Sequence, residues 1–301
     1  MVNIGIVEIN SLVGKSILES IIRRNLLDYN YYFYGTVEGH VSFNNKLHDI
    51  KKFNVHHLDN LDYVILATDN SISKEIYTYC MDADVPITII DNSSEFRLKD
   101  NIPLCIPEIN SHVLINSHLS SQNVYPTKLI SNPNCITTLM CMVLKPLMNL
   151  GNIRRIIAST YKSTISDGDH NTLFNEEELK LVNETKKILN INPKITATCI
   201  QVPTLRSNCI SLNVEFNQDL NEHDIINELI QFPGVTVCNN FADNTFLEPI
   251  NTSGETDVYV GRIRSDIGDK SCWNFFISGD QLLKGSGYNS VQILEHLINY
   301  H

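Results

Sequence analysis

The chain has little positive charge for its size. Its 301 residues include 23 lysines and arginines against 34 aspartates and glutamates, so the formal net charge is −11 at pH 7, and no basic run is present. Proteins that bind nucleic acids usually carry a basic patch or stripe, so this balance argues against a nucleic-acid partner. The acidic excess mainly favours solubility.

Three other patterns are missing. No two of the eight cysteines form a Cys-x-x-Cys pair, and their spacing fits neither a metal site nor a disulfide framework, so we expect reduced thiols and no metal. No apolar run approaches the roughly 20 residues of a membrane-spanning helix. The first residues also lack the basic region of a signal peptide. We therefore expect a cytoplasmic protein without a membrane partner.

What the chain does have is apolar material for a real core, with 43% hydrophobic residues. Up to about residue 131, short apolar runs alternate with segments of helical spacing. The runs at 3–7, 31–34, 63–67 and 86–90 are typical of strands, and 13–24 and 73–81 are typical of helices. This alternation predicts an α/β fold, a doubly wound parallel sheet of the Rossmann type.

The second part of the chain has a different pattern. Segments 154–160, 195–202 and 209–216 read as strands, 258–264 and 272–277 flank a turn and predict a hairpin, and 176–189 and 221–231 predict helices. We therefore expect an α+β layer with a mostly antiparallel sheet. The composition shift near residue 131 is the best boundary, and the last predicted helix, 289–300, is expected to pack back on the first domain.

Cys135 is the most informative residue. It ends the run Ser-Asn-Pro-Asn-Cys at 131–135 and opens a segment with apolar residues three or four apart. A thiol in the first turn of a helix meets unpaired backbone N–H groups and the positive end of the helix dipole, and both favour the nucleophilic thiolate. The alternative is a small buried hydrophobic residue, as most lone cysteines are.

Several further runs stand out, at 91–97, 107–110, 131–135, 258–264, and 280–285 followed by 289–293. In sequence and in order, these runs resemble those of the aspartate-semialdehyde dehydrogenase family. The resemblance extends from end to end. It implies a dinucleotide-binding domain at 1–131, with the C-terminal helix at 285–301 packed on it, and a substrate and dimerisation domain at 132–284. It also implies a homodimer and NADP or NAD as cofactor.

The resemblance implies a reaction as well. The thiolate of Cys135 would form a thioester with aspartyl phosphate, or react with aspartate semialdehyde in reverse, with phosphate and a nicotinamide cofactor taking part. Asn134 would be the neighbour that positions the thiol. The implied substrate-binding residues are Arg97, Lys162, Glu184 and Lys187, and the implied cofactor-binding residues are Asn10, Ser11, Leu12, Val13, Glu38 and Gln281. Without the resemblance, Glu184 and Lys187 would read as an exposed ion pair on one helix face.

The cofactor positions depart from the family pattern. Of the three glycines that follow the first strand in the family, only Gly14 is present, and Glu8 and Ser11 occupy the other two positions. A side chain there crowds the pyrophosphate, and Glu8 adds negative charge beside it. Glu38 would repel the 2′-phosphate of NADP, so NAD is the easier cofactor. A solvated loop glutamate is an equally good interpretation of Glu38.

The substrate positions depart too. Asn208 occupies the place of the family's histidine base, and an amide cannot take a proton near neutral pH. Gln201 stands in place of an arginine that would bind the substrate carboxylate, and Lys162 stands in place of a glutamine. His170, in the loop that follows Lys162, could replace the missing base, although a loop histidine is usually only solvated.

Two hypotheses follow. The chain is either a dehydrogenase of this family, with activity impaired by the altered positions, or a non-catalytic paralogue that serves as an interaction or oligomer partner. A third reading, the related N-acetyl-glutamyl-phosphate reductase, is less favoured by the context of Cys135 and by the run at 280–285.

Overall fold

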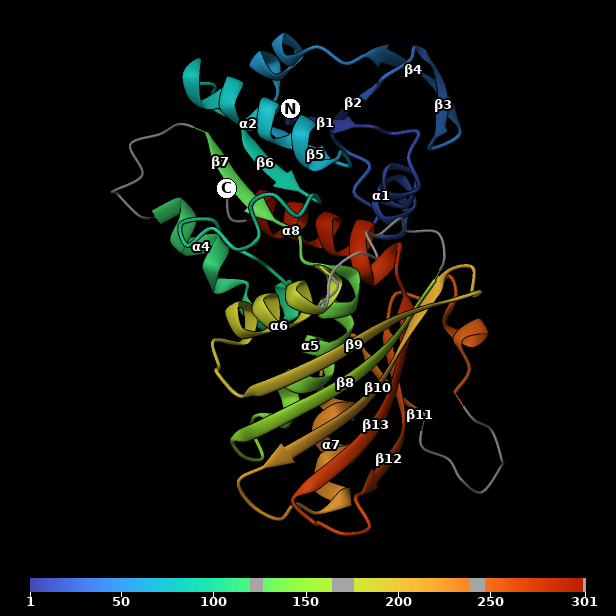
Figure 1. The fold of residues 1–301 in the computed structure, drawn as a ribbon. Coiled ribbons are helices and arrows are strands. Elements are labelled where there is room, and N and C mark those ends of the chain that lie inside the picture. Colours follow the sequence, from blue (N-terminus) through green and yellow to red (C-terminus); the bar gives the residue numbers. More distant parts are fainter. Residues whose placement is uncertain (120–126, 164–175, 239–246, 300–301) are drawn as a thin grey trace. The chain divides into compact units, whose positions relative to one another are not determined.

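The computed structural model describes residues 1–119, 127–163, 176–238 and 247–299, which form two compact units (Figure 1). The first unit is Met1–Pro133 with Ser286–His301, and the second is Asn134–Gly285. His170 lies outside the described residues.

The first unit is a seven-stranded sheet with helices. Its strands are β1 (Asn3–Val7), β2 (Asn30–Gly35), β3 (Gly39–Phe43), β4 (Lys46–Lys52), β5 (Tyr63–Leu66), β6 (Thr88–Asp91) and β7 (Lys128–Ser131). Its helices are α1 (Leu12–Arg23), the 3-10 helix η1 (Val55–Asn60), α2 (Asn70–Asp82), α3 (Pro107–Asn110), α4 (His112–Leu119) and α8 (Tyr288–Asn299). The strand order is β3-β4-β2-β1-β5-β6-β7, and only the β3–β4 pair is antiparallel.

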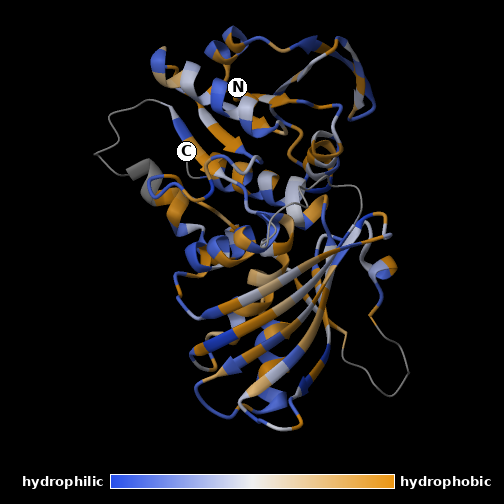
Figure 2. Ribbon diagram, viewed as in Figure 1, coloured by the Kyte–Doolittle hydropathy of each residue, from blue (hydrophilic) through white to orange (hydrophobic). Residues whose placement is uncertain are grey.

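This arrangement confirms the predicted Rossmann-type sheet. β5 and β6 are buried along their whole length, as expected for parallel strands covered on both faces, and both are largely hydrophobic in Figure 2. The sequence did not predict the β3–β4 hairpin. In β4 only Ile50 is buried, so this strand lacks the apolar run that marks β5 and β6.

The C-terminal helix α8 packs on the core of the first unit. Val291, Leu294 and Leu297 belong to the same buried cluster as Ile17 and Ile21 of α1. At the start of α8, the side-chain amide of Asn289 donates to the carbonyl of Cys105 and to Oδ1 of Asn132, at 3.0 and 2.7 Å. Apolar packing and a buried amide therefore both fix this helix.

The second unit is a six-stranded sheet with helices on one face (Figure 1). Its helices are α5 (Cys135–Leu147), α6 (Glu176–Leu189), α7 (Glu222–Gln231) and the 3-10 helix η2 (Pro249–Thr252), and the π-helix η3 (Leu283–Gly287) ends it. Its strands are β8 (Ile153–Ser163), β9 (Lys194–Val202), β10 (Ser207–Phe216), β11 (Val235–Cys238), β12 (Val258–Ser265) and β13 (Cys272–Asp280).

The sheet of the second unit has the order β11-β12-β13-β10-β8-β9. The β12–β13, β13–β10 and β10–β8 pairs are antiparallel, which confirms the mostly antiparallel sheet and the predicted hairpin. The β11–β12 and β8–β9 pairs are parallel. Apolar and polar residues alternate along these strands, as the banding in Figure 2 shows, because one face packs against helices α5, α6 and α7.

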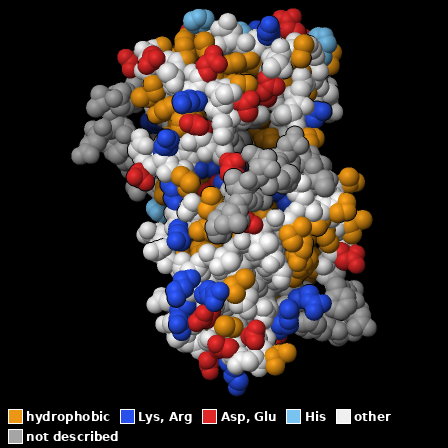
Figure 3. Space-filling model, viewed as in Figure 1, with side chains coloured by type: hydrophobic (Ala, Val, Ile, Leu, Met, Phe, Trp, Pro, Cys, Tyr) orange, Lys and Arg blue, Asp and Glu red, His pale blue; other side chains and the backbone are white. Residues whose placement is uncertain are grey.

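The face of this sheet that carries no helix among the described residues has an uncharged stretch, with the exposed Arg155 and Lys194 beside it. Its exposed side chains include Ile157, Thr196, Thr198, Ile200 and Ser211, which lie on adjacent strands in register. Uncharged and hydrophobic atoms cover much of this side of the molecule in Figure 3, with lysines and arginines toward its end.

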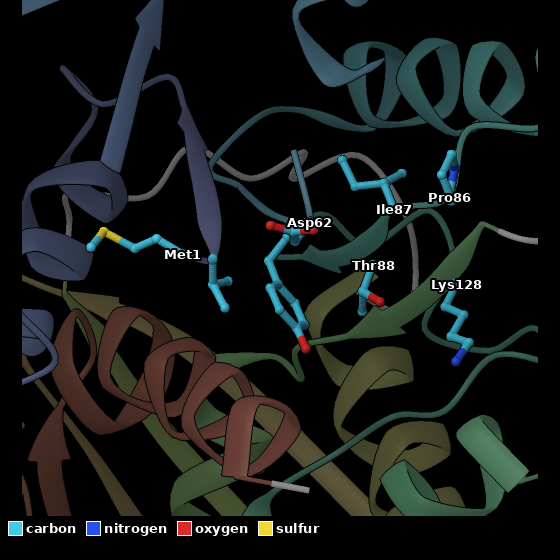
Figure 4. Close-up of a pocket in the computed structure, with 8 residues that line it drawn as sticks. Met1, Asp62, Pro86, Ile87, Thr88 and Lys128 are labelled. Atoms are coloured by element: carbon cyan, nitrogen blue, oxygen red, sulfur yellow. The ribbon is translucent and has the colours of Figure 1, made fainter. Parts of the chain in front are cut away.

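A pocket of about 530 Å³ opens in the first unit, among residues shown in Figure 4. Asp62, Thr88 and Lys128 line it at the amino ends of the parallel strands β5, β6 and β7. Ligands of doubly wound sheets bind at the carboxyl ends of the strands, so this pocket is not where a dinucleotide is expected. Within the described ranges, no helix combines the length and apolarity needed to cross a membrane.

Candidate active site

Cys135 is the first residue of α5, as the sequence predicted. The side chain of Asn134 caps the helix, because its Oδ1 accepts a hydrogen bond from the backbone N–H of Ile136 at 2.9 Å. Cys135 is partly exposed, whereas the eight residues after Ile136 are all buried. The thiol therefore sits at the positive end of a well-anchored helix, where a thiolate is favoured.

Asn208 lies beside the sulfur. Its Nδ2 donates to Cys135 Sγ at 3.3 Å, and its Oδ1 accepts from the backbone N–H of Ser163 at 2.9 Å. Both bonds fix the amide orientation, and the side chain is fully buried. Asn208 can therefore stabilise negative charge on sulfur, but it supplies no basic nitrogen there.

Gly285 closes another side of the thiol. A Cβ atom at this position would lie 2.7 Å from Cys135 Cβ, closer than side-chain carbons normally approach. The glycine that ends the 280–285 run is therefore required by the close approach of the chain to the cysteine. Sequence reasoning used this run for family resemblance and did not assign Gly285 to the site.

Glu177, on α6, is a site residue that sequence reasoning missed. Its Oε2 accepts from Lys162 Nζ at 2.8 Å and from Asn134 Nδ2 at 2.9 Å, and Lys180 Nζ approaches its Oε1 at 3.3 Å. Burial would raise the pKa of Glu177, but the charges of Lys162 and Lys180 and these hydrogen bonds lower it to about 2. The run of three glutamates at 176–178 was the only signal, and it does not distinguish Glu177 from its neighbours.

Lys162, on β8, is only 8% exposed. Burial lowers the pKa of its ammonium group, but the negative charges of Cys135 and Glu177 outweigh this and raise the pKa above the ordinary lysine value. Lys162 therefore stays protonated near neutral pH. Lys162 is thus a buried cation that is bonded to Glu177.

Glu184 has a structural role. Its Oε2 accepts from the backbone N–H of Asn134 at 2.7 Å, and the side chain is fully buried. The interpretation of Glu184 and Lys187 as an ordinary exposed ion pair is therefore wrong, because Glu184 is inaccessible to solvent. Lys187 is partly buried on the same helix, α6.

In the first unit, the loop between β1 and α1 keeps the shape of a glycine loop. Glu8 has a φ of 60°, in the left-handed region that favours glycine. Ser11 has an ordinary φ of −66° and caps α1 by accepting from the N–H of Gly14 at 2.9 Å. A Cβ at Gly14 would lie 2.4 Å from the carbonyl oxygen of Glu8, so this glycine permits the close approach of helix and strand.

The other predicted cofactor positions are divided between the units. Asn10 and Leu12 are exposed and Val13 is half-buried around the start of α1, while Glu38 is exposed in the turn after β2. Gln281 belongs to the second unit and is buried, with its backbone N–H donating to the carbonyl of Arg206.

Arg97 lies in a polar segment of the first unit. Its Nη2 donates to the carbonyl of Asn92 at 2.8 Å, and the residue is 8% exposed. Asp91, which precedes this segment, accepts from the hydroxyls of Ser73 and Ser93, both at 2.7 Å. Burial raises the pKa of Asp91 although these bonds and the charge of Arg97 oppose it.

Comparisons with known proteins agree with this arrangement. Residues 29–117 match the family model "Semialdehyde dehydrogenase, NAD binding domain", and residues 164–284 match "Semialdehyde dehydrogenase, dimerisation domain". The aspartate-semialdehyde dehydrogenase of Prochlorococcus marinus is 31% identical over 289 residues, covering 83% of this chain and 81% of that protein. That of Rickettsia conorii is 28% identical over 340 residues, covering 99% and 98%.

Solved structures show the same fold. Aspartate semialdehyde dehydrogenase II from Vibrio cholerae superposes with a TM-score of 0.87 at 24% identity, covering 99% of this chain and 98% of that one. The enzyme from Candida albicans, solved with NADP, superposes with a TM-score of 0.81 at 18% identity, covering 99% of each chain. With two matching family models, a relative above 30% identity and a thiol at the start of α5, the chain belongs to the aspartate-semialdehyde dehydrogenase family.

Proposed function

We propose that this protein interconverts aspartyl 4-phosphate and aspartate semialdehyde through a thioester on Cys135. The observation that carries the proposal is the partly exposed sulfur at the first position of α5, hydrogen-bonded by Asn208 at 3.3 Å. Relatives that cover most of the chain carry the name of this enzyme.

In the proposed reaction, the thiolate attacks the acyl carbon of aspartyl phosphate. A carbon–sulfur bond forms, the bond from carbon to the bridging oxygen breaks, and phosphate leaves with the electron pair. A bound nicotinamide cofactor would supply the hydride that reduces the thioester. Asn134 holds the thiol through the helix cap, and Asn208 donates to the sulfur when it carries negative charge.

Substrate binding is assigned to four residues by the family pattern. Arg97 is proposed to bind the phosphate group, because a guanidinium offers a planar pair of donors. We further propose that Lys162, Glu184 and Lys187 define the substrate region, with the buried Glu184 acting through its bond to Asn134.

The backbone of the β1–α1 loop is suited to binding a dinucleotide, but the side chain of Glu8 in this loop disfavours it. Its left-handed residue and its close-packed Gly14 are features of a pyrophosphate loop, but the residue with φ 60° is Glu8, whose carboxylate repels phosphate. We propose that Asn10, Ser11, Leu12, Val13, Glu38 and Gln281 hold NAD or NADP. Glu38 favours the binding of NAD over NADP, and Glu8 weakens the binding of both cofactors.

We also propose that the protein is a homodimer with domains at 1–131 plus 285–301 and at 132–284. The dimerisation-domain match and the uncharged stretch on the sheet face of the second unit support the dimer. An exposed face of this kind is commonly an interface. We expect the protein to act in the cytoplasm.

A non-catalytic paralogue is the second candidate, favoured by Glu8 in the cofactor loop and by Asn208 beside the thiol. Purified protein with aspartate semialdehyde, phosphate and NAD or NADP distinguishes the two, by absorbance of the reduced cofactor. A rate that disappears in Cys135→Ala supports the enzyme. No Cys135-dependent rate, with no detectable cofactor binding by calorimetry, supports the paralogue.

A further inference from the structure

The side chain that touches the sulfur has a charged neighbour on the next strand. Cys209 of β10 pairs with Tyr161 of β8 in the antiparallel ladder. Continued by one residue, this register places Asn208 opposite Lys162, and Asn208 Oδ1 accepts from the backbone N–H of Ser163, the next residue of β8. Opposite residues in such a ladder place their side chains on the same face, with Cβ atoms about 5 Å apart. The side chain of Lys162 therefore lies beside that of Asn208, on the face of the sheet from which Asn208 reaches Cys135 Sγ.

Glu177 fixes the ammonium group of Lys162 in this position. Its Oε2 accepts from Lys162 Nζ at 2.8 Å and from the side chain of Asn134 at 2.9 Å. Asn134 immediately precedes the cysteine and caps its helix. The carboxylate of Glu177 therefore links Lys162 to Asn134, the residue next to Cys135.

The further titratable groups that interact with Lys162, Glu177 and Asn134 within the described residues are Lys180 and Glu184 of α6 and Cys199 of β9. On η3, whose Gly285 approaches Cys135, Lys284 is a further buried cation. Glu177 lies between two ammonium groups, and Glu184 accepts from the N–H of Asn134. Both carboxylates are thus engaged by donors, while Lys162 is buried beside Asn208, whose amide contacts the sulfur, and feels the negative charge that the sulfur gains when it ionises.

We propose that Lys162 is the counter-ion of the Cys135 thiolate and that Glu177 is the residue that positions it. Forming the pair breaks only the S–H bond. Its proton goes to solvent, and the ammonium keeps its own. A permanently charged lysine would thus hold the nucleophile ionised where Asn208 offers no base. The inference rests on the proposed function because it concerns the same thiol, and it assigns Lys162 a role toward sulfur.

The test is the pH dependence of Cys135 alkylation, followed by peptide mass spectrometry between about pH 5 and pH 10, the range in which thiols ionise. It needs neither substrate nor cofactor. In Lys162→Gln, we expect alkylation at neutral pH to slow about tenfold and the profile to move about one pH unit higher, as for loss of one nearby charge. Lys162→Arg should keep the profile close to that of the wild type.

The variants carry internal controls. Cys272, at the far end of the β10–β13 ladder opposite Glu215, is partly exposed and should react alike in every variant. Cys141 is fully buried in α5, so its alkylation reports unfolding. If Lys162→Gln exposes Cys141, the test uses Glu177→Gln instead. This variant keeps the lysine but removes the carboxylate that holds it. The alkylation profile of Cys135 should then move to higher pH by a smaller amount.

An unchanged Cys135 profile in folded Lys162→Gln would overturn the proposal. If Glu177→Gln is the variant used, an unchanged Cys135 profile in that variant would also overturn the proposal. Turnover is measured separately. If the protein shows no turnover but its alkylation profile depends on Lys162, the proposed function is refuted and the counter-ion role of Lys162 stands. If the enzyme is active but the profile does not depend on Lys162, the counter-ion role is refuted and the proposed function stands.

Discussion

At the scale of single residues, the site combines a buried cation with a buried amide. By the family resemblance, Lys162 and Asn208 take the places of a glutamine and a histidine, and the register of β8 and β10 sets the two side by side. Lys162 therefore supplies positive charge near the sulfur, while Asn208 supplies no basic nitrogen.

Restoring the base should restore rate. In Asn208→His, an imidazole beside Cys135 could exchange protons with reacting groups, and general-base catalysis is typically worth 10²–10⁴-fold. We expect kcat to rise at least about tenfold, measured by cofactor absorbance. Asn208→Gln keeps an amide without a basic nitrogen and should show no rise. An equal kcat in both variants would contradict the expectation.

The cofactor loop offers a second residue-scale prediction. Glu8→Gly removes a carboxylate from the pyrophosphate loop and relieves a left-handed backbone that costs roughly 1–2 kcal/mol for a residue with a side chain. We expect the Kd for NAD, measured by calorimetry, to fall at least about tenfold. Asn45→Gly is the matched control, since Asn45 has a φ of 58° in the β3–β4 turn. A gain in affinity from both variants, or from neither, would argue against the charge of Glu8.

At the scale of elements, the start of α5 depends on α6. Glu184 accepts from the N–H of Asn134, and Glu177 accepts from its side chain, so two carboxylates of one helix fix the first turn of another. The geometry of the thiol is therefore set by packing between these helices.

The ion pair of Lys162 and Glu177 should appear in the pH dependence of stability. The pKa of Glu177 is lowered from 4.5 to about 2, so its contribution is complete above about pH 4.5 and is lost as the pH falls toward 2. We expect urea unfolding to show Glu177→Gln less stable than the wild type at pH 6, with the difference shrinking through this window.

Glu176→Gln is the matched control for that experiment. Glu176 is adjacent on α6 and also pairs with Lys180, but its side chain is 64% exposed. Exposed pairs contribute little, so this variant should match the wild type at every pH. A difference for Glu177→Gln that does not change with pH would show that the ion pair is not its cause.

Elements were easier to predict than their contacts. The helix that begins at Cys135 and most strands of both sheets follow from apolar spacing, which is a local property of the chain; β3, β4, β7 and β11 were not predicted. The bond between Lys162 and Glu177 joins a strand to a helix, and no local pattern singles out the middle residue of three consecutive glutamates. Asn208 was placed beside the thiol only through family resemblance, because 73 residues separate it from Cys135.

At the scale of the whole molecule, the sheet face of the second unit that no helix covers in the described part of the chain predicts self-association. Thr198 is exposed on this face, midway along the edge strand β9 and opposite Ser159 of β8. We expect Thr198→Glu to shift sedimentation at micromolar concentration from dimer toward monomer, because it buries a charge in the interface. Ile267→Glu is the control, since Ile267 is fully exposed in the turn between β12 and β13. A wild-type monomer would rule out the dimer.

Whether Cys135 becomes acylated decides between a working enzyme and an inert relative. Protein mixed with aspartyl phosphate in the absence of cofactor can be quenched in acid, digested and mapped by mass spectrometry. We predict an aspartyl group on the peptide that contains Cys135, removed by hydroxylamine and absent from Cys135→Ala. Unmodified Cys135 in folded protein under these conditions would contradict a nucleophilic role for this thiol.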